Sequence, residues 1–314
     1  MKLKKIVFFG TPDFASHVFS HLLENKILIV GVVTQPDKPK GRSLQLTPSS
    51  VKKVCPENIP LFQPNRSSDP EFIENLRSLA ADLFVVVAFG QILPQKLLEI
   101  PPLGCINVHA SLLPKYRGAA PIQRALLNGD LETGVSIQKM VKELDAGDVI
   151  DEVKIPLPLE MNFGELEASL CNLSKDLLMH VLEKYEQGVP KARAQDAALV
   201  TFAPKIAPEE LKIDWRRSNF EIHNQVRAFS PKPGAWCSVL IQGETKRLKI
   251  LTTQMSDQKA QIGQIVPDQK LIVGCGQGSL ILHAVQPEGK SKMSGSDWLR
   301  GFKNSAQPPV FINI

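Results

Sequence analysis

The sequence predicts a two-domain chain in which an α/β domain with a mostly parallel sheet is followed by a small β-barrel. Over the first two thirds of the chain, apolar runs alternate with helical patterns. This alternation fails after Gly188, and short strand-like patterns follow it. A length of 314 residues also exceeds one hydrophobic core of ordinary size, so two domains are expected.

Five apolar runs are the candidate strands of the first domain. A strand in a parallel sheet is buried on both faces when helices cover the sheet, so its sequence is almost continuously apolar. The runs are residues 6–9, 28–33, 83–88, 105–109 and 134–138. Their alternation with helical patterns is typical of a Rossmann-like fold.

Three helices are predicted in the same domain. Thr11 followed by Pro12 indicates an N-cap and a proline at the first helical position, which open a helix through about Glu24. A second helix begins near Asp69. A third spans residues 163–186, where apolar residues at three- and four-residue spacing form one stripe. We interpret this stripe as core packing.

The second domain begins after an irregular stretch. Residues 189–208 contain three prolines and mixed charge, and they are predicted to link a domain of residues 1–188 to one of residues 209–314. Ser218 and Glu221 form a capping box for a short helix. Short strands are then predicted at 236–241, 247–251, 261–266, 271–273 and 279–284. Five short strands favour a small barrel, and we expect the oligonucleotide-binding (OB-like) type.

Positive charge is concentrated in the last third of the chain. The net charge is +5, and residues 208–314 contain 14 Lys and Arg against 9 Asp and Glu, whereas the residues before them contain 23 of each. A slightly basic solvated surface and a platform for a phosphate-rich partner both fit this distribution. Composition alone does not decide between them.

Composition also argues against several classes of protein. No run of about 18 apolar residues indicates a membrane span. The apolar stretch after Met1 breaks at Gly10, too early for a signal peptide. The five cysteines are an odd number without close pairs, which argues against a disulfide framework and a zinc site. We therefore expect a cytoplasmic protein.

Asn107 and His109 end one of the predicted buried strands. They are two residues apart, so both side chains project from the same face. The ligand crevice of an open α/β sheet lies at the carboxyl ends of its strands, where such a pair is well placed for chemistry. A polar pair that only caps a strand is the competing interpretation, and these two residues alone do not exclude it.

The residues around this pair resemble a family signature. The segment Asn107 to Pro114, with Arg117-Gly118-Ala119, is similar to the signature of formyltransferases that use 10-formyltetrahydrofolate, and Leu144 to Asp148 resembles their second signature. Further similar segments, at 10–14, 34–38, 213–215 and 286–293, extend the resemblance over essentially the whole chain. The carboxyl-terminal segments narrow it to members that act on methionyl initiator tRNA.

The resemblance implies specific roles for residues of this chain. The implied catalytic set is Asn107, His109 and Asp145, and the implied folate-contacting segment is Ser111, Leu112, Leu113 and Pro114. The implied cosubstrate is 10-formyltetrahydrofolate, with no metal. The implied acceptor is the amino group of methionyl initiator tRNA, formylated for translation initiation. We expect the chain to act as a monomer.

The chemistry of formyl transfer independently suits these residue types. Transfer between two nitrogens passes through a tetrahedral intermediate with negative charge on the formyl oxygen. The Asn107 amide is a neutral donor for that oxygen, and deleting one such donor typically costs about 10²–10³ in kcat. His109 can donate beside it or shuttle a proton, and Asp145 would orient the imidazole and favour its charged form. Without the signature, Asp145 would be interpreted as a turn residue.

The segment between Thr34 and Ser50 lacks periodicity and is predicted to be a loop. A solvated linker is the plain interpretation. In the resembled family this loop enters the tRNA acceptor stem, which implies contacts from Lys38, Lys40 and, above all, Arg42. Relatives often carry lysines where this sequence has residues 43–46. Electrostatic attraction is therefore expected to contribute less to tRNA binding by this loop. We predict that this loop and the basic second domain grip phosphates together.

Other interpretations remain to be tested. The acceptor could be an amino sugar nucleotide, glycinamide ribonucleotide or water, although the basic second domain argues against these. A non-catalytic RNA-binding relative is a further alternative, and the intact catalytic set argues against it. His17 and His21 are four residues apart, but no third ligand accompanies them, so we predict a packing or surface role rather than a metal site.

Overall fold

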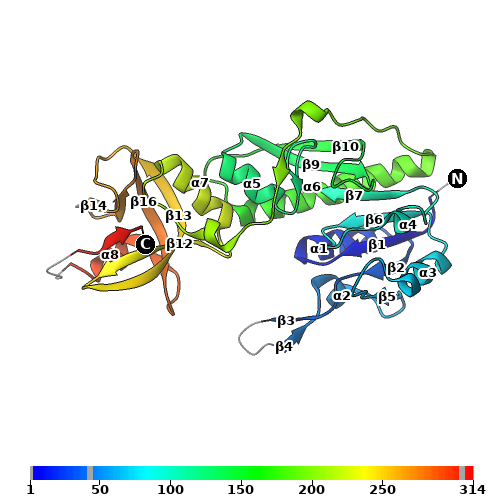
Figure 1. The fold of residues 1–314 in the computed structure, drawn as a ribbon, viewed down its shortest axis with the longest axis horizontal. Coiled ribbons are helices and arrows are strands. Elements are labelled where there is room, and N and C mark those ends of the chain that lie inside the picture. The colour runs from blue at the N-terminus through cyan, green and yellow to red at the C-terminus, as the bar shows by residue number, and fades with distance from the viewer. Residues whose placement is uncertain (1–2, 41–44, 267, 304–307, 314) are drawn as a thin grey trace. The chain divides into compact units, whose positions relative to one another are not determined.

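The computed structural model describes residues 3–40, 45–266, 268–303 and 308–313 (Figure 1). The chain divides into two compact units, and each contains more than one stretch of sequence. Unit 1 comprises Met1–Gly118, Thr133–Ile155 and Glu167–Ala203. Unit 2 comprises Ala119–Glu132, Pro156–Leu166 and Pro204–Ile314.

Unit 1 is built on a seven-stranded sheet of order β10-β9-β7-β6-β1-β2-β5. Its strands are β1 (Ile6–Gly10), β2 (Ile29–Val33), β5 (Leu61–Phe62), β6 (Leu83–Val87), β7 (Cys105–His109), β9 (Glu132–Lys139) and β10 (Val149–Pro156). Strands β1, β2, β5, β6 and β7 pair in parallel, whereas β9 runs antiparallel to β7. The predicted mostly parallel sheet is confirmed.

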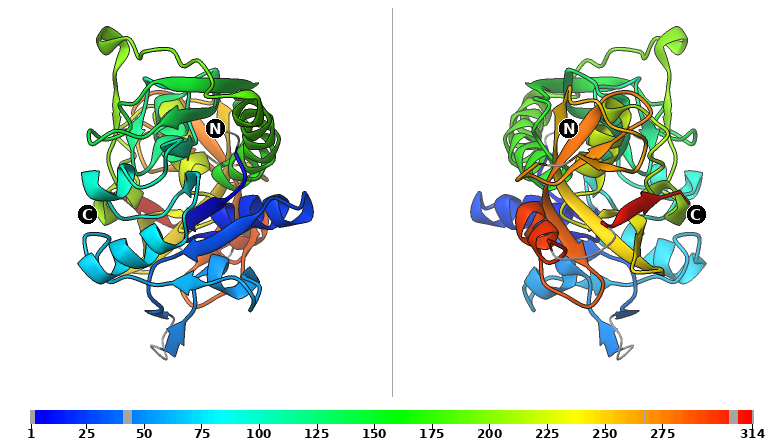
Figure 2. Two further views of the ribbon diagram at one scale, coloured as in Figure 1. Left: turned by 90° about the vertical axis from the view of Figure 1, so that its right-hand side faces the viewer. Right: turned by 90° about the vertical axis from the view of Figure 1, so that its left-hand side faces the viewer.

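The central strands β1, β2 and β6 are apolar throughout because helices cover both faces of the sheet. Alternate strand residues point to opposite faces. Phe8 packs on Phe19 of α1 (Asp13–Glu24), with ring centroids 5.0 Å apart. Phe9, on the other face, belongs to a core cluster with residues of α3 (Pro70–Ser78) and α4 (Gln95–Leu98). Figure 2 (left) shows α3 and α4, in cyan, on one side of the sheet, and α1, in blue, on the other.

The predicted helices are present as α1, α3 and α6 (Phe163–Gln187), but one cap differs. The prediction that Thr11 caps α1 is wrong, because Pro12 occupies the N-cap position without a side-chain cap. The Thr11 hydroxyl instead donates to the Phe89 carbonyl at 2.8 Å. Two further helices of unit 1 were not predicted, namely α2 (Ser50–Val54) and the short α4.

Residues 189–208 return to unit 1 over much of their length. They contain the 3₁₀ helix η1 (Ala197–Leu199) and strand β11 (Phe202–Ala203). Strand β11 pairs in parallel with β8 (Arg117–Gly118), which lies shortly after the polar end of β7. The segment therefore contributes backbone hydrogen bonds next to that end of the sheet.

Unit 2 contains an antiparallel sheet of order β14-β15-β16-β13-β12-β18, with β17 paired to β16. Its strands are β12 (Ala235–Ile241), β13 (Glu244–Ser256), β14 (Ile265–Val266), β15 (Ile272–Gly274), β16 (Ser279–Pro287), β17 (Met293–Ser294) and β18 (Val310–Ile312). The five predicted strands match β12 to β16. The Phe311 amide donates to the Gly263 carbonyl at 2.9 Å, which brings the two edges of the sheet together as in a partly open barrel.

The described part of unit 2 also contains the α-helices α5 (Pro121–Asn128), α7 (Asn219–Phe229) and α8 (Gly295–Arg300), together with the 3₁₀ helix η2 (Pro208–Leu211). The predicted capping box of α7 is confirmed, since the Glu221 amide donates to Ser218 Oγ and the Ser218 amide donates to the Glu221 carboxylate. The Ser218 amide and hydroxyl both donate to the Glu221 carboxylate, and with hydrogen bonds from Arg217 they lower the pKa of Glu221 to about 2. In the described ranges, no helix is both long and apolar enough to cross a membrane.

Candidate active site

The polar pair of β7 lies beside a second row of polar residues on β9. The antiparallel register places Asn107 opposite Gln138 and His109 opposite Ser136. His109, Ser136 and Gln138 are almost fully buried, at 5%, 0% and 1% exposure. Buried polar side chains need hydrogen-bond partners, so the partners of these residues define the site.

Asp145 is the partner that these residues share. Its Oδ1 accepts from Gln138 Nε2 at 2.8 Å and from Asn107 Nδ2 at 3.3 Å. Its Oδ2 accepts from the Gly118 amide at 2.9 Å. Three donors aimed at two oxygens suit a carboxylate anion. The structure therefore brings the predicted residues Asn107, His109 and Asp145 together.

His109 is held at one ring nitrogen and faces Asp145 with the other. Nε2 lies 2.8 Å from the Tyr116 carbonyl oxygen, which can only accept, so Nε2 carries a hydrogen. Nδ1 lies 3.7 Å from Asp145 Oδ2, which is longer than a hydrogen bond. In the neutral ring this leaves a lone pair at Nδ1 beside a carboxylate. The arrangement suits uptake of a proton at Nδ1.

The Asn107 amide has a hydrogen to spare. One N–H points to Asp145, and within the described part of the chain the Asn107 side chain makes no other hydrogen bond. The residue is half-buried rather than enclosed. Its second N–H can therefore donate to the oxygen of a bound carbonyl group, and to the negative charge that develops there during acyl transfer.

The backbone around Asp145 is held in an uncommon conformation. Asp145 has a φ of 47°, in the left-handed region that most residues avoid. Gln195 Nε2 donates to the Asp145 carbonyl at 2.8 Å and to the Gly147 carbonyl at 2.7 Å. A Cβ at Gly147 would collide with the Lys139 carbonyl, so only glycine fits there. These contacts fix the direction of the Asp145 carboxylate.

Gln195 is oriented in turn by Arg117. The Arg117 guanidinium donates to Gln195 Oε1 from Nε at 3.0 Å and from Nη2 at 2.8 Å. Because Oε1 accepts from Arg117, the Gln195 amide nitrogen is the atom that faces the loop carrying Asp145. Arg117 and Gly118 form β8, which is held by its pairing with β11.

Several of these residues were not predicted to belong to the site. Gln138 ends the predicted strand 134–138, and a polar residue at a buried strand end is a signal that could have indicated it. Gln195 lies in an irregular segment where no periodicity marks it. Tyr116 and Gly118 contribute only backbone groups, which a sequence pattern does not reveal.

The predicted folate-contacting segment follows His109 directly. Ser111 and Leu113 are buried, and Ser136 Oγ donates to the Ser111 carbonyl at 2.8 Å and accepts from the Leu113 amide at 3.0 Å. Leu112 is only half-buried. The segment thus offers a fixed backbone and one half-buried apolar side chain, that of Leu112. A fixed backbone with an apolar side chain suits contact with an apolar ring system.

The residues predicted to contact tRNA are only partly described. Lys38 and Lys40 bound strand β3, which pairs antiparallel with β4 (Gln45–Thr47), so part of the segment predicted to be a loop consists of two paired strands. Lys38 is exposed. Arg42 lies outside the described residues. No group of three or more His, Cys, Asp or Glu suited to a metal ion occurs in the described ranges, and His21 instead lies 3.8 Å from Glu24.

The two sheets and the polar cluster at the end of β7 define a two-part α/β enzyme suited to acyl transfer. Residues 4–182 match the family profile described as formyl transferase, and residues 205–303 match its C-terminal domain. The chain belongs to the formyltransferase family. It is 46% identical over 305 residues to the methionyl-tRNA formyltransferase of Protochlamydia amoebophila, covering 96% of each chain.

Solved structures share the fold. A sugar 3N-formyl transferase, WlaRD, crystallised in the presence of dTDP and 5-N-formyl-THF, has a TM-score of 0.65 and 19% identity over 93% of this chain and 100% of that chain. HypX from Aquifex aeolicus, in complex with tetrahydrofolic acid, has a TM-score of 0.66 and 17% identity. This chain spans 48% of HypX.

Proposed function

We propose that this chain transfers the formyl group of 10-formyltetrahydrofolate to the free amino group of methionyl initiator tRNA. The observation that carries the proposal is the match to a methionyl-tRNA formyltransferase through 96% of both chains, which includes both units. Folate supplies the formyl group, and the half-buried Leu112 is assigned to its ring system. The similarity to the sugar formyltransferase concerns the fold alone.

The chain's own residues would divide the chemistry as follows. The free N–H of Asn107 donates to the formyl oxygen and stabilises the negative charge that develops on it. His109 takes up a proton at Nδ1, where Asp145 Oδ2 at 3.7 Å stabilises the resulting imidazolium. The attacking amine must lose a proton and the leaving nitrogen must gain one, so a group that both accepts and returns a proton is required.

The two parts of the chain would have separate tasks. Residues 1–188 carry the chemistry, residues 189–208 connect the parts, and residues 209–314 bind tRNA with their excess positive charge. Lys38, Lys40 and Arg42 would add contacts to the tRNA. A task in translation initiation places the protein in the cytoplasm.

One incubation series tests the acceptor. The purified protein is supplied with 10-formyltetrahydrofolate and, separately, with methionyl initiator tRNA, free methionine, an amino sugar nucleotide and glycinamide ribonucleotide. We expect formylation of the charged tRNA only. Formylation of a small acceptor with no reaction on the tRNA would contradict the proposal.

A single substitution tests the mechanism. His109→Ala removes the proton acceptor but no charged contact for tRNA, so we expect normal tRNA binding and a loss of turnover of about 10²–10⁴-fold. Near-normal turnover would remove His109 from its assigned role.

A further inference from the structure

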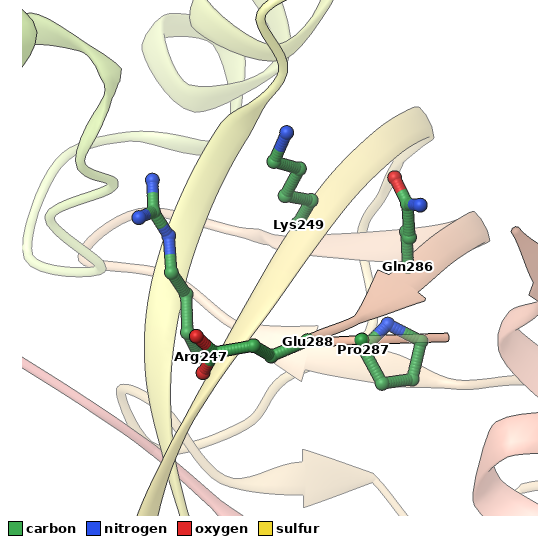
Figure 3. A pocket seen from close by; sticks show the side chains of 6 residues that line it. Arg247, Lys249, Gln286, Pro287 and Glu288 are labelled. Carbon is green, nitrogen blue, oxygen red and sulfur yellow. The ribbon is translucent and has the colours of Figure 1, made fainter. Parts of the chain in front are cut away.

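A pocket of about 220 Å³ lies on the sheet of unit 2 (Figure 3). Arg247 and Lys249 of β13 line it, together with residues 286–289 at the end of β16 and in the turn that follows. Those four residues begin the segment 286–293, which belongs to the sequence signature but has no part in the candidate active site. The pocket therefore lies between a segment of the family signature and the cationic side chains of Arg247 and Lys249.

Strand register places these side chains on one face of the sheet. Lys249 lies opposite Trp236 on β12 and opposite Gln286 on β16. Arg247 is two residues from Lys249, so it projects from the same face. Leu248, between them, is 2% exposed and points into the core. The polar face is thus a regular product of strand alternation.

The two cations are fixed in place before any ligand binds. The Arg247 guanidinium lies over the Trp236 ring, 4.1 Å from its centroid, and Lys212 Nζ lies 5.7 Å from the same ring. Among the described residues, the Arg247 guanidinium makes no hydrogen bond or ion pair, so its donors remain available. Lys249 Nζ donates to the Pro233 carbonyl at 2.8 Å, which leaves its other hydrogens free.

The charge around the pocket favours an anion. Figure 3 shows Arg247 and Lys249 extending in the same direction, while the Glu288 carboxylate lies near the base of Arg247. Lys290 and Lys292, in the same segment as Glu288, are exposed. The planar fork of an arginine with a neighbouring ammonium matches the oxygens of a phosphodiester. Since the guanidinium already covers the Trp236 ring, the ring serves to position Arg247 rather than to stack on a base.

We propose that this pocket binds a backbone phosphate of the tRNA acceptor, with Arg247 and Lys249 as donors and Trp236 as a positioning residue. The inference rests on the proposed function, because it takes tRNA as the partner. It assigns a role to the segment 286–293, whose turn forms one wall of the pocket.

Binding of methionyl initiator tRNA across a series of salt concentrations tests this site. We expect Arg247→Ala to weaken binding about tenfold, the typical effect of losing one charge-assisted hydrogen bond. Removing both cations in R247A/K249A should flatten the slope of log affinity against log salt by about 0.9, the contribution of the one phosphate assigned to the pocket. Turnover at saturating tRNA should stay within about twofold, because the catalytic cluster is untouched.

Two matched variants complete the experiment. Lys259→Ala removes one exposed charge beyond the other end of β13, roughly 20 Å from Lys249 at about 3.3 Å per strand residue, and should change affinity less than twofold. Trp236→Leu removes the ring without changing charge and should weaken binding, whereas Trp236→Phe should retain most of it. Circular dichroism checks that each variant folds.

The outcomes separate the two proposals. If wild-type protein formylates the tRNA and R247A/K249A binds with unchanged affinity and slope, the pocket has no role in binding. Equal losses for Lys259→Ala and Arg247→Ala would also overturn the site, because overall charge would then explain the effect. If wild-type protein neither binds nor formylates the tRNA, the proposed function itself fails.

Discussion

Gln195 Nε2 donates to the main-chain carbonyl of Asp145 at 2.8 Å, across 50 residues of sequence. Asp145 in turn accepts hydrogen bonds from Asn107 and the Gly118 amide through its carboxylate. Gln195 thus holds the backbone of Asp145, whose side chain the proposed reaction requires, although Gln195 is not one of the proposed catalytic residues. A small displacement of this support would move the carboxylate relative to His109.

Gln195→Ala should therefore lower kcat with little change in KM. A misplacement of about 1 Å can cost on the order of 10²-fold in rate, and we expect a loss of about 10- to 100-fold. Steady-state formylation with each substrate varied in turn measures the effect. Gln187→Ala, at an exposed glutamine at the end of α6, is the control and should be silent. A rise in KM with unchanged kcat would show that Gln195 serves substrate binding instead.

Asn107→Ala should lose about 10²–10³-fold in kcat, because it removes the donor assigned to the developing negative charge. Asn107→Asp should not restore the rate, since a carboxylate in place of the amide has no hydrogen to donate and would repel Asp145. Rates at saturating substrates measure both effects. A fully active Asn107→Asp variant would contradict the donor role.

Gly118→Ala should destabilise unit 1. Gly118 has a φ of 125°, and a Cβ would come within 2.7 Å of the Ala203 carbonyl of β11. Gly188 also has a positive φ, 144°, but nothing within 4 Å of a Cβ, so Gly188→Ala isolates the cost of conformation alone. We expect about 1 kcal/mol for Gly188→Ala and roughly 1–3 kcal/mol more for Gly118→Ala, measured by urea unfolding. Equal losses of unfolding free energy in the two variants would show that the backbone near β11 shifts to accommodate the added Cβ.

Stability should fall as the pH drops below about 6.5, because of His223 in unit 2. Burial lowers the pKa of His223 from its ordinary 6.5, while its ring nitrogens are hydrogen-bonded to Thr253 and to the Leu159 carbonyl. The unfolded chain therefore binds a proton that the folded chain excludes. This contributes up to about 1.4 kcal/mol per pH unit to the loss of stability until the folded pKa is reached.

Urea unfolding between pH 7.5 and 5 measures this effect. His223→Gln keeps a donor for the Leu159 carbonyl but does not titrate, so its stability should depend less on pH. His17→Gln replaces an exposed histidine of α1 and is the matched control, whose stability should keep the pH dependence of the wild type. If His223→Gln retains the full slope, other groups cause it.

The sequence predicted those features that depend on local pattern. Continuous apolar runs located the central strands, and two-residue spacing placed Asn107 and His109 on one face. Strand β10 was missed because its sequence mixes charged with apolar residues at the sheet edge. Strand β18 was missed because its three residues, which follow two prolines, are too few to show a two-residue alternation. The contacts of Gln195 depend on where an irregular segment returns in the fold, which only tertiary structure decides.

The return of that segment also sets an order of assembly on the ribosome. Asn107, His109 and Asp145 all lie within residues 4–182, the part that matches the formyl transferase profile. Gln195 and β11 follow it. A nascent chain that has emerged only through α6 already contains the three side chains, but the loop that carries Asp145 still lacks both hydrogen bonds of the Gln195 amide. The geometry of the proposed catalytic residues is therefore completed late in the synthesis of unit 1.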